Sequence, residues 1–116
     1  MSDQSPSSVI RMGLPGASGR MGRMITHAVD ANDYVMIASA TDHPSSDWIG
    51  HDTGLINNLS ESKIIIGGAI DDLFAPALDV IVDFTAPDAS VAHAEMAAKK
   101  GVPIVVGTTG LGDVHI

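Results

Sequence analysis

Short apolar runs alternate along the chain with segments in which apolar residues recur at helical spacing. The first run, Val9 to Leu14, ends at a Pro-Gly pair, which favours a strand followed by a tight turn. The segment after this turn has the period of a helix. The apolar face expected for that helix consists of Met21, Met24, Ile25, Ala28 and Val29. The pattern therefore predicts a strand, a glycine-rich turn and a helix as the first unit of the fold.

The alternation continues along the rest of the chain. Further strands are expected at 34–41, 64–66, 80–82 and 103–106, and further helices at 71–75 and 87–100. The last helix has well-marked ends, because Pro87 suits a first turn and Gly101 suits the position after a last turn. Residues 42–62 show no sustained period, which predicts a long irregular connection. Strands that alternate with helices predict an α/β fold with a Rossmann-like parallel sheet and helices on both faces.

Composition and charge narrow the class of partner. The 116 residues fit one domain, expected at 9–116 after a disordered polar tail at 1–8, and the 45% of hydrophobic residues can supply its core. The net charge of −8 and the scattered basic residues disfavour nucleic acid. Apolar runs are shorter than the roughly 20 residues of a membrane span. The chain has no cysteine, which is compatible with a reducing compartment, so a cytoplasmic protein is expected.

A glycine triplet carries the first chemical signal. Gly16, Gly19 and Gly22 lie between the first expected strand and helix, in a spacing close to G-x-G-x-x-G. Such glycines permit a sharp turn, close approach of a pyrophosphate and tight packing of helix on strand, and the helix start offers N–H groups to the phosphates. A purely structural turn uses the same residues. The predicted pyrophosphate-binding residues are Gly16, Ala17, Ser18, Gly19, Arg20 and Met21.

Asp42 strengthens the dinucleotide interpretation. It follows Gly22 by 20 residues, at the end of the second expected strand, where a carboxylate binds the adenosine ribose. The alternative role is a turn residue before Pro44. His43 stands where a cation would meet a 2′-phosphate, but an imidazole is only partly charged at neutral pH. The cofactor is therefore expected to be NADH or NADPH, with NADH or dual use favoured.

Two segments after later strands are expected at the same edge of the sheet. Gly107, Thr108 and Thr109 begin a Gly-Thr-Thr-Gly segment whose hydroxyl and N–H groups are candidates for contacts with the nicotinamide, although a plain glycine turn fits the spacing equally well. Phe84, in Asp-Phe-Thr, is a candidate for packing against a cofactor ring or for the core.

Other chemistries find less support in the sequence. A phosphate-loop NTPase needs Gly-Lys-Ser/Thr, whereas Arg20 and Met21 follow the glycine here. The remaining histidines show no metal-ligand spacing, so no metal site is expected and surface positions are predicted for them. They are His27, His51, His93 and His115.

Three motifs together resemble the N-terminal domain of the 4-hydroxy-tetrahydrodipicolinate (dihydrodipicolinate) reductase family. They are the turn 16–22 with its Gly-Arg-Met-Gly ending, Asp-Phe-Thr at 83–85 and Gly-Thr-Thr-Gly at 107–110. The resemblance implies hydride transfer from NAD(P)H to a cyclic imine dicarboxylate in diaminopimelate and lysine biosynthesis. It also implies pyrophosphate contacts from 16–21, ribose contacts from Asp42, and nicotinamide and substrate-edge contacts from 107–109. His43 stands where many members have Arg, which disfavours a strict preference for NADP.

In that family a second domain supplies a Glu-x-His-His-x-x-x-Lys segment, and nothing like it occurs in this sequence. The sequence therefore assigns no catalytic residue, and we expect the chain alone to hold the hydride donor without completing turnover. The resemblance implies a homotetramer for the full-length enzyme. Two other interpretations stay open, a CoA-binding module of a ligase and a free-standing regulatory domain. Asp42 disfavours CoA, whose 3′-phosphate calls for cations.

Overall fold

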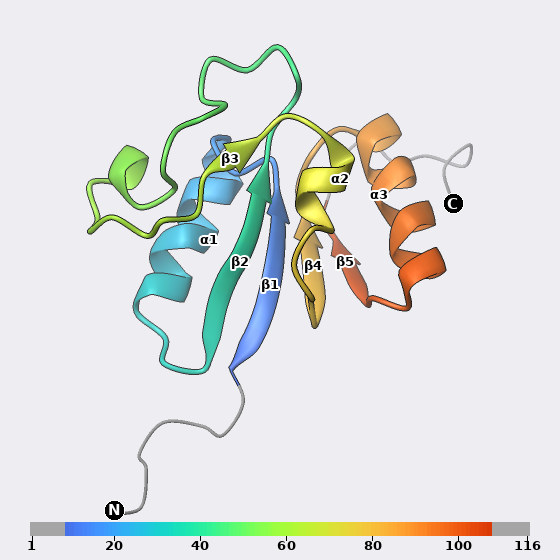
Figure 1. Cartoon of the computed structure of the whole chain (residues 1–116), viewed down its shortest axis with the longest axis horizontal. Coiled ribbons are helices and arrows are strands. Elements are labelled where there is room, and N and C mark those ends of the chain that lie inside the picture. Colours follow the sequence, from blue (N-terminus) through green and yellow to red (C-terminus); the bar gives the residue numbers. More distant parts are fainter. Residues whose placement is uncertain (1–8, 108–116) are drawn as a thin grey trace, which may run out of the picture.

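The computed structural model describes residues 9–107 and, within them, shows one parallel sheet with helices on both faces (Figure 1). The elements are β1 (Ile10–Pro15), α1 (Arg20–Asp30), β2 (Val35–Thr41), the 3₁₀ helix η1 (Leu55–Asn57), β3 (Ile66–Gly67), α2 (Ile70–Leu73), β4 (Val80–Asp83), α3 (Pro87–Lys100) and β5 (Ile104–Val106). The expected Rossmann-like α/β fold is confirmed. The expected tail at 1–8 and residues 108–116 lie outside the described residues.

The strand order places the loops after β1 and β4 next to each other. The order is β3-β2-β1-β4-β5, so the chain builds the sheet to one side of β1 and then returns to build the other side. β1 pairs with β4 through Met12 and Gly13, which lie opposite Val80 and Ile81. In open parallel sheets the crevice at such a reversal, beyond the carboxyl ends of the strands, is where ligands bind.

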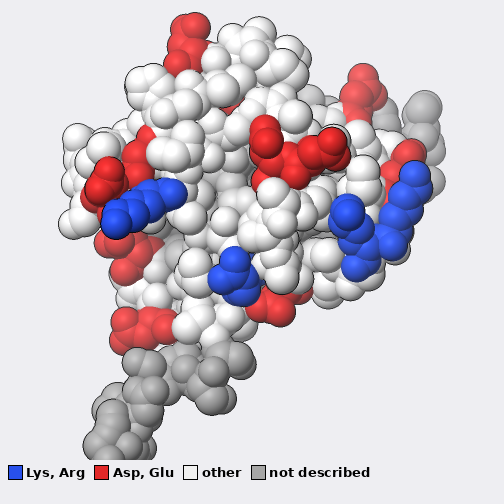
Figure 2. Space-filling model, viewed as in Figure 1, with Lys and Arg blue, Asp and Glu red and all other residues white. Residues whose placement is uncertain are grey.

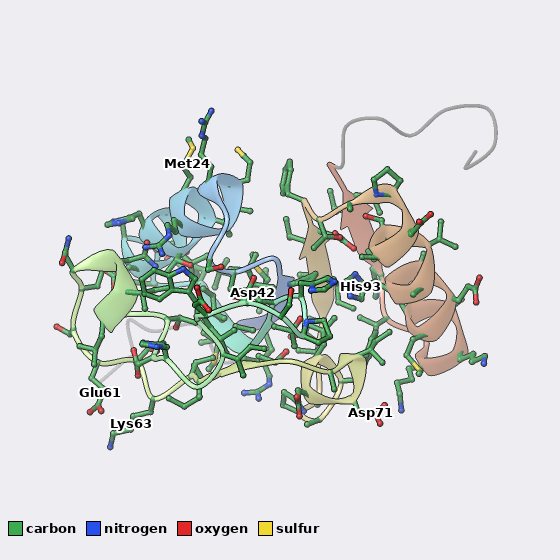
Figure 3. All side chains as sticks on the ribbon, turned by 90° about the horizontal axis from the view of Figure 1, so that it is seen from above. Met24, Asp42, Glu61, Lys63, Asp71 and His93 are labelled. Carbon is green, nitrogen blue, oxygen red and sulfur yellow. The ribbon has the colours of Figure 1, made fainter. Side chains whose placement is uncertain are left out.

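Two apolar clusters cover the two faces of the sheet. On the α1 side the buried residues are Leu14, Ala17, Ile37, Ala40 and Ile66. On the α2 and α3 side they are Leu73, Ile81 and Ala97. Gly13 of β1 faces the second cluster, where a Cβ would lie 2.8 Å from a methyl carbon of Leu78. Figure 3 shows α1 and α2 on opposite sides of the strands. The glycine therefore lets the second layer pack directly on the backbone of β1.

Helix α1 is confirmed, but its buried face differs from the predicted one. Its buried residues are Gly22 and Thr26, because Gly22 packs directly on the carbonyl groups of Gly16 and Ala17. This close approach sets the rotation of the helix. Of the predicted face, Ile25 and Val29 are half-buried, whereas Met21, Met24 and Ala28 are exposed.

The connection between β2 and β3 is largely irregular, as predicted, and a buried carboxylate organises it. Asp52 accepts hydrogen bonds from the N–H groups of Gly54, Leu55, Ser62 and Lys63. Burial alone would raise the pKa of Asp52, but these bonds outweigh it and lower the pKa to about 2. The strand expected at 64–66 is shorter than predicted, because only its last residue pairs with β2.

Candidate functional site

A cavity of about 480 Å³ opens at the carboxyl ends of the strands. It extends from the glycine turn and the end of β2 to the start of α3. Figure 3, which looks down on this edge, shows Asp42 near the middle of the molecule and His93 beside α3. The sequence-predicted residues that line it are Gly16, Ser18, Gly19, Asp42, His43 and Phe84. The structure thus brings together residues from three separate segments of the sequence.

The glycine turn has a backbone that other residues cannot adopt without strain. Gly16 has a φ of +74°, and a Cβ there would lie 2.9 Å from the Thr85 methyl group. The N–H groups of Gly16 and Ala17 both donate to the carbonyl of Thr41, at 2.8 and 3.1 Å. The turn is therefore anchored to the end of β2 and packed against the loop after β4.

Helix α1 begins beside the cavity without a side-chain cap. Gly19 is the N-cap residue, no side chain accepts a hydrogen bond from the first turn, and that turn contains no acidic residue. A Cβ at Gly19 would approach only the carbonyl oxygen of Gly16, at 3.4 Å. The start of a helix carries partial positive charge and N–H groups without intrahelical acceptors. This arrangement accommodates an anionic group of a ligand.

Asp42 and His43 follow β2 at the same end of the cavity. Asp42 is half-buried, and its carboxylate accepts hydrogen bonds from the Ser18 N–H at 3.3 Å and the Ser46 hydroxyl at 3.4 Å. The bond from Ser18 ties the carboxylate to the glycine turn, and the bond from Ser46 ties it to the loop after β2. His43 is exposed, and its Nδ1 accepts a hydrogen bond from the Ser45 N–H at 3.1 Å. The Ser45 hydroxyl also lies 2.7 Å from Nδ1, so the local turn holds the ring through this nitrogen and leaves Nε2 outside these contacts.

Four predicted residues do not line the cavity. Ala17 is fully buried in the core, whereas Arg20 and Met21 are exposed at the start of α1. The N–H of Gly107 donates to the Asp83 carbonyl at 2.8 Å, and a Cβ on Gly107 would overlap the Phe84 ring. Phe84 therefore packs on Gly107 while also bordering the cavity. Thr108 and Thr109 lie outside the described residues.

The structure also reveals a buried charged cluster that sequence reasoning did not find. Asp83, at the end of β4, is fully buried and lies 2.7 Å from Nδ1 of His93. Asp83 also accepts hydrogen bonds from the N–H and hydroxyl of Thr85, at 2.8 and 2.6 Å, and from the Ser90 hydroxyl at 3.2 Å. Burial alone would raise the pKa of Asp83, but the bonds from His93 and Thr85 outweigh it, so the net shift is downward.

The surface position predicted for His93 is wrong. The residue is 9% exposed and lines the cavity from α3. A signal was present in the sequence, because Ser90, His93 and Ala97 recur at helical spacing and so share one face of the helix. In the structure this face of α3 is the buried one. Asp83 is the matching signal, since a carboxylate that directly follows a buried apolar strand needs partners. His27 and His51 are exposed as predicted, and His115 lies outside the described residues.

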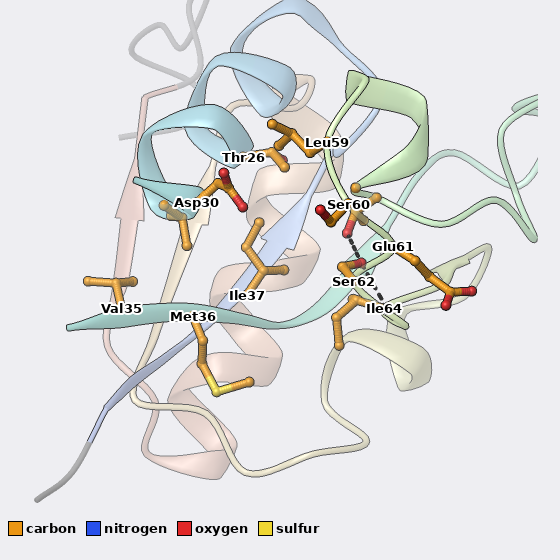
Figure 4. Close-up of a pocket in the computed structure, with 13 residues that line it drawn as sticks. Thr26, Asp30, Val35, Met36, Ile37, Leu59, Ser60, Glu61, Ser62 and Ile64 are labelled. Carbon is orange, nitrogen blue, oxygen red and sulfur yellow. Dashed lines mark hydrogen bonds between the residues drawn. The ribbon is translucent and has the colours of Figure 1, made fainter. Parts of the chain in front are cut away.

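A second cavity, of about 290 Å³, lies between α1, β2 and the segment 59–64 (Figure 4). Its lining includes Asp30 and Glu61 but none of the predicted site residues. It also lies away from the loops that follow β1 and β4. The cavity at the strand ends is therefore the one that the chemistry of the chain favours.

Neither a metal-binding cluster nor a membrane-spanning helix occurs among the described residues. Among residues 9–107, no group of three or more His, Cys, Asp or Glu side chains is placed to hold a metal ion. No helix in the same range has the length and apolar character needed to cross a bilayer. On the face shown in Figure 2, basic side chains stand in separate groups among acidic ones.

The fold and the cavity define a class of protein. A parallel sheet with a chain reversal between β1 and β4, a glycine turn before an uncapped helix and an acidic residue after β2 form a Rossmann-like nucleotide-binding domain. The sequence profile of the family described as dihydrodipicolinate reductase, N-terminus, matches residues 10–116. The chain belongs to this family.

Relatives named 4-hydroxy-tetrahydrodipicolinate reductase agree with this assignment. The one from Roseobacter denitrificans is 36% identical over 107 residues, which cover 92% of this chain and 39% of the relative. The one from Magnetococcus marinus is 37% identical over 101 residues, covering 87% and 37%. The one from Rhodopseudomonas palustris is 38% identical over 104 residues, covering 90% and 38%. The chain thus spans less than half of the length of these relatives.

Proposed function

We propose that the chain is the cofactor-binding domain of an NAD(P)H-dependent reductase that acts on a cyclic imine dicarboxylate in diaminopimelate and lysine biosynthesis. The observation that carries the proposal is the cavity in which an uncapped helix start, a glycine turn and Asp42 meet. The names of the relatives support the reaction. When bound, NAD(P)H supplies the hydride.

The pyrophosphate lies against the glycine turn in this proposal. Gly16, Ser18 and Gly19 border the cavity, so their backbone offers close approach, and the first N–H groups of α1 meet the phosphate oxygens. Arg20 and Met21 contribute their backbone N–H groups, and the exposed guanidinium of Arg20 adds positive charge nearby. Ala17 acts differently, because its N–H already donates to the Thr41 carbonyl and its side chain anchors the turn in the core.

The adenosine ribose lies against Asp42 in the same arrangement. The carboxylate accepts hydrogen bonds from the ribose hydroxyls and disfavours a neighbouring 2′-phosphate by charge repulsion. Because Nδ1 of His43 accepts the Ser45 N–H, the proton of the neutral ring lies on Nε2, where it can be donated to a hydroxyl or a phosphate oxygen. NADH or dual use is therefore favoured over strict use of NADPH.

The nicotinamide half lies towards β4 and β5. Phe84 borders the cavity, Gly107 supports its ring, and Thr108 and Thr109 follow directly in the sequence. We place the substrate lobe and its proton donor in the part of the relatives that this chain does not span. On that basis the chain alone binds cofactor without turnover, and cytoplasmic location and a homotetrameric full-length enzyme are further parts of the proposal.

Calorimetric titration of the 116-residue chain with NADH, NADPH and CoA tests the proposal. NADH binding with an affinity equal to or tighter than that of NADPH is expected. Asp42→Ala should lower the affinity for NADH by roughly tenfold or more, since it removes hydrogen bonds from the ribose to a charged acceptor. Asp33→Ala is the matched control, because Asp33 is exposed in the turn between α1 and β2. CoA binding without dinucleotide binding would overturn the proposal, and tighter binding of NADPH would overturn the preference for NADH.

A further inference from the structure

The end of the cavity opposite Asp42 contains a polar atom whose role the cofactor site described above leaves open. His93 lines the cavity from α3, and its side chain is 11% exposed. Nδ1 is engaged by Asp83 at 2.7 Å. Among residues 9–107, no protein group forms a hydrogen bond with the other ring nitrogen, Nε2. A buried polar atom ordinarily has a hydrogen-bond partner, so we expect a ligand group or a water molecule to form a hydrogen bond with Nε2.

Asp83 determines which nitrogen of His93 carries the proton. Burial alone would raise the pKa of Asp83, but hydrogen bonds from His93 and Thr85 lower it. Asp83 is therefore a carboxylate at neutral pH and can only accept hydrogen bonds. Nδ1 of His93 must therefore be the donor. In the neutral ring this leaves a lone pair on Nε2, which accepts a hydrogen bond. Because Asp83 fixes the proton on Nδ1, Nε2 of His93 selects a ligand group that can donate a hydrogen bond, such as a hydroxyl or an N–H.

The position of His93 identifies which part of a dinucleotide would meet it. Asp42 follows β2, the glycine turn follows β1, and Phe84 and His93 belong to β4 and α3 on the far side of the chain reversal. A dinucleotide with its adenosine at Asp42 and its pyrophosphate at the glycine turn continues across β1 towards β4. The second ribose then lies between the turn and α3.

We propose that Nε2 of His93, oriented by the buried Asp83, accepts a hydrogen bond from a hydroxyl of the nicotinamide ribose. His93 is then a cofactor-binding residue, and Asp83 is a positioning residue that acts through it. The inference rests on the proposed dinucleotide function. It adds a contact to the nicotinamide half that no motif in the sequence indicates.

Two substitutions separate the contact with the cofactor from the contact with Asp83. In His93→Asn the amide nitrogen takes the place of Nδ1, so the bond to Asp83 is kept and the group at Nε2 is lost. In His93→Gln the terminal amide reaches the place of Nε2, so an acceptor is kept and the donor to Asp83 is lost. If His93 is merely structural, His93→Asn should keep more of both the stability and the cofactor affinity than His93→Gln. If His93 binds the cofactor as proposed, His93→Gln should keep more of the affinity.

Affinities for ADP, ADP-ribose and NADH are then measured by calorimetry on the 116-residue chain and its variants. His93→Asn is expected to lower the affinity for ADP-ribose and NADH by roughly three- to tenfold, which matches the loss of one hydrogen bond. The affinity for ADP should be unchanged. His93→Gln should recover part of this loss. Equal weakening of ADP, no weakening at all, or a loss confined to NADH would each overturn the assignment to the ribose hydroxyl.

A measurement on the unaltered chain keeps the test valid if a variant fails to fold. Long-range ¹H–¹⁵N spectra of His93 are expected to show a protonated Nδ1 and an unprotonated Nε2 whose resonance shifts on addition of ADP-ribose but not of ADP. An Nε2–H tautomer, or no shift, contradicts the inference. If the unaltered chain binds ADP and no dinucleotide, the proposed function fails; if it binds NADH while His93→Asn binds equally well, only this inference fails.

Discussion

At the scale of single residues, two buried carboxylates have opposite relations to function. Asp83 directs His93 towards the cavity, whereas Asp52 lies in the long connection and accepts bonds from Ser62 and Lys63. Both have lowered pKa values, because their hydrogen bonds outweigh the effect of burial. A shifted pKa alone therefore does not distinguish a site residue from a structural one, and the cavity beside His93 makes the difference.

Asp52→Asn is predicted to destabilise the chain by about 2 kcal/mol at pH 7, because an amide nitrogen would face backbone N–H groups. The folded pKa of about 2 lies below the ordinary value of 3.8, so the stabilisation by Asp52 is fully present above pH 4. It is lost as the pH falls from about 4 to 2. Urea unfolding of both proteins across this range checks the prediction.

The difference between the two proteins should shrink towards zero at the acid end. Exposed Asp47 provides the control, since Asp47→Asn should change stability little at any pH. A difference between Asp52→Asn and the unaltered chain that stays constant from pH 7 to pH 2 would contradict a role for the ionised carboxylate.

How much of the site the sequence predicts also depends on single residues. Asp42 was predicted from its place after the second strand, and the structure puts it beside the glycine turn. The sequence predicts a surface position for His93 from its lack of metal-ligand spacing, whereas the structure pairs it with Asp83 across a turn and part of a helix. A pattern within one element does not show such a pair. The spacing of residues along the sequence therefore predicts side chains at strand ends more readily than pairs of side chains that meet only when elements pack together.

At the scale of elements, backbone contacts override apolar periodicity at α1. The sequence predicts the position of this helix, yet Met21 and Met24 are exposed, because contact between Gly22 and the carbonyl of Gly16 decides which face turns inward. Helix α3 was predicted more closely, from Pro87 to Lys100, since its ends depend on local properties of proline and glycine. Local signals predict ends of elements well, whereas rotation about the helix axis depends on the partner.

Arg23 connects α1 to the long connection. It donates hydrogen bonds to the carbonyls of Ser18 and Ile56, at 2.8 and 2.6 Å, and its guanidinium lies 4.8 Å from the Trp48 ring centre. A lysine ammonium lacks the fork of donors with which the guanidinium bonds both carbonyls while it lies over the ring. Arg23 therefore adds to the bonds of Asp42 in joining this loop to the glycine turn.

Arg23→Lys is predicted to lower the free energy of unfolding by about 1–2 kcal/mol and to shift the fluorescence of Trp48 to longer wavelength. Trp48 is the only tryptophan of the chain, so its emission reports directly on this contact. Arg20→Lys, in the same helix but exposed, should change neither quantity. Unchanged emission in Arg23→Lys would show that Trp48 is held by other contacts.

At the scale of the whole molecule, the fold consists of two packed halves that meet at β1 and β4. Alternation of strands and helices predicts this architecture, because each parallel strand requires a crossover. The meeting of the halves depends on Gly13, which has no side chain to separate β1 from Leu78, and on Asp79, which accepts the Arg11 N–H at 2.8 Å. Binding a ligand across the reversal adds a third link between them.

Hydrogen exchange tests whether the ligand forms this link. Because the proposed dinucleotide contacts Asp42 in one half and His93 in the other, NADH should slow amide exchange both at 16–19 and 41–46 and at 84–93. ADP, which lacks the second ribose and the nicotinamide, should protect only the first two segments. At free NADH of about 100 times Kd, binding should also raise the free energy of unfolding by about 2.7 kcal/mol. Protection confined to the glycine turn with both ligands would place the cofactor in one half, and the fold would then serve as a mononucleotide site.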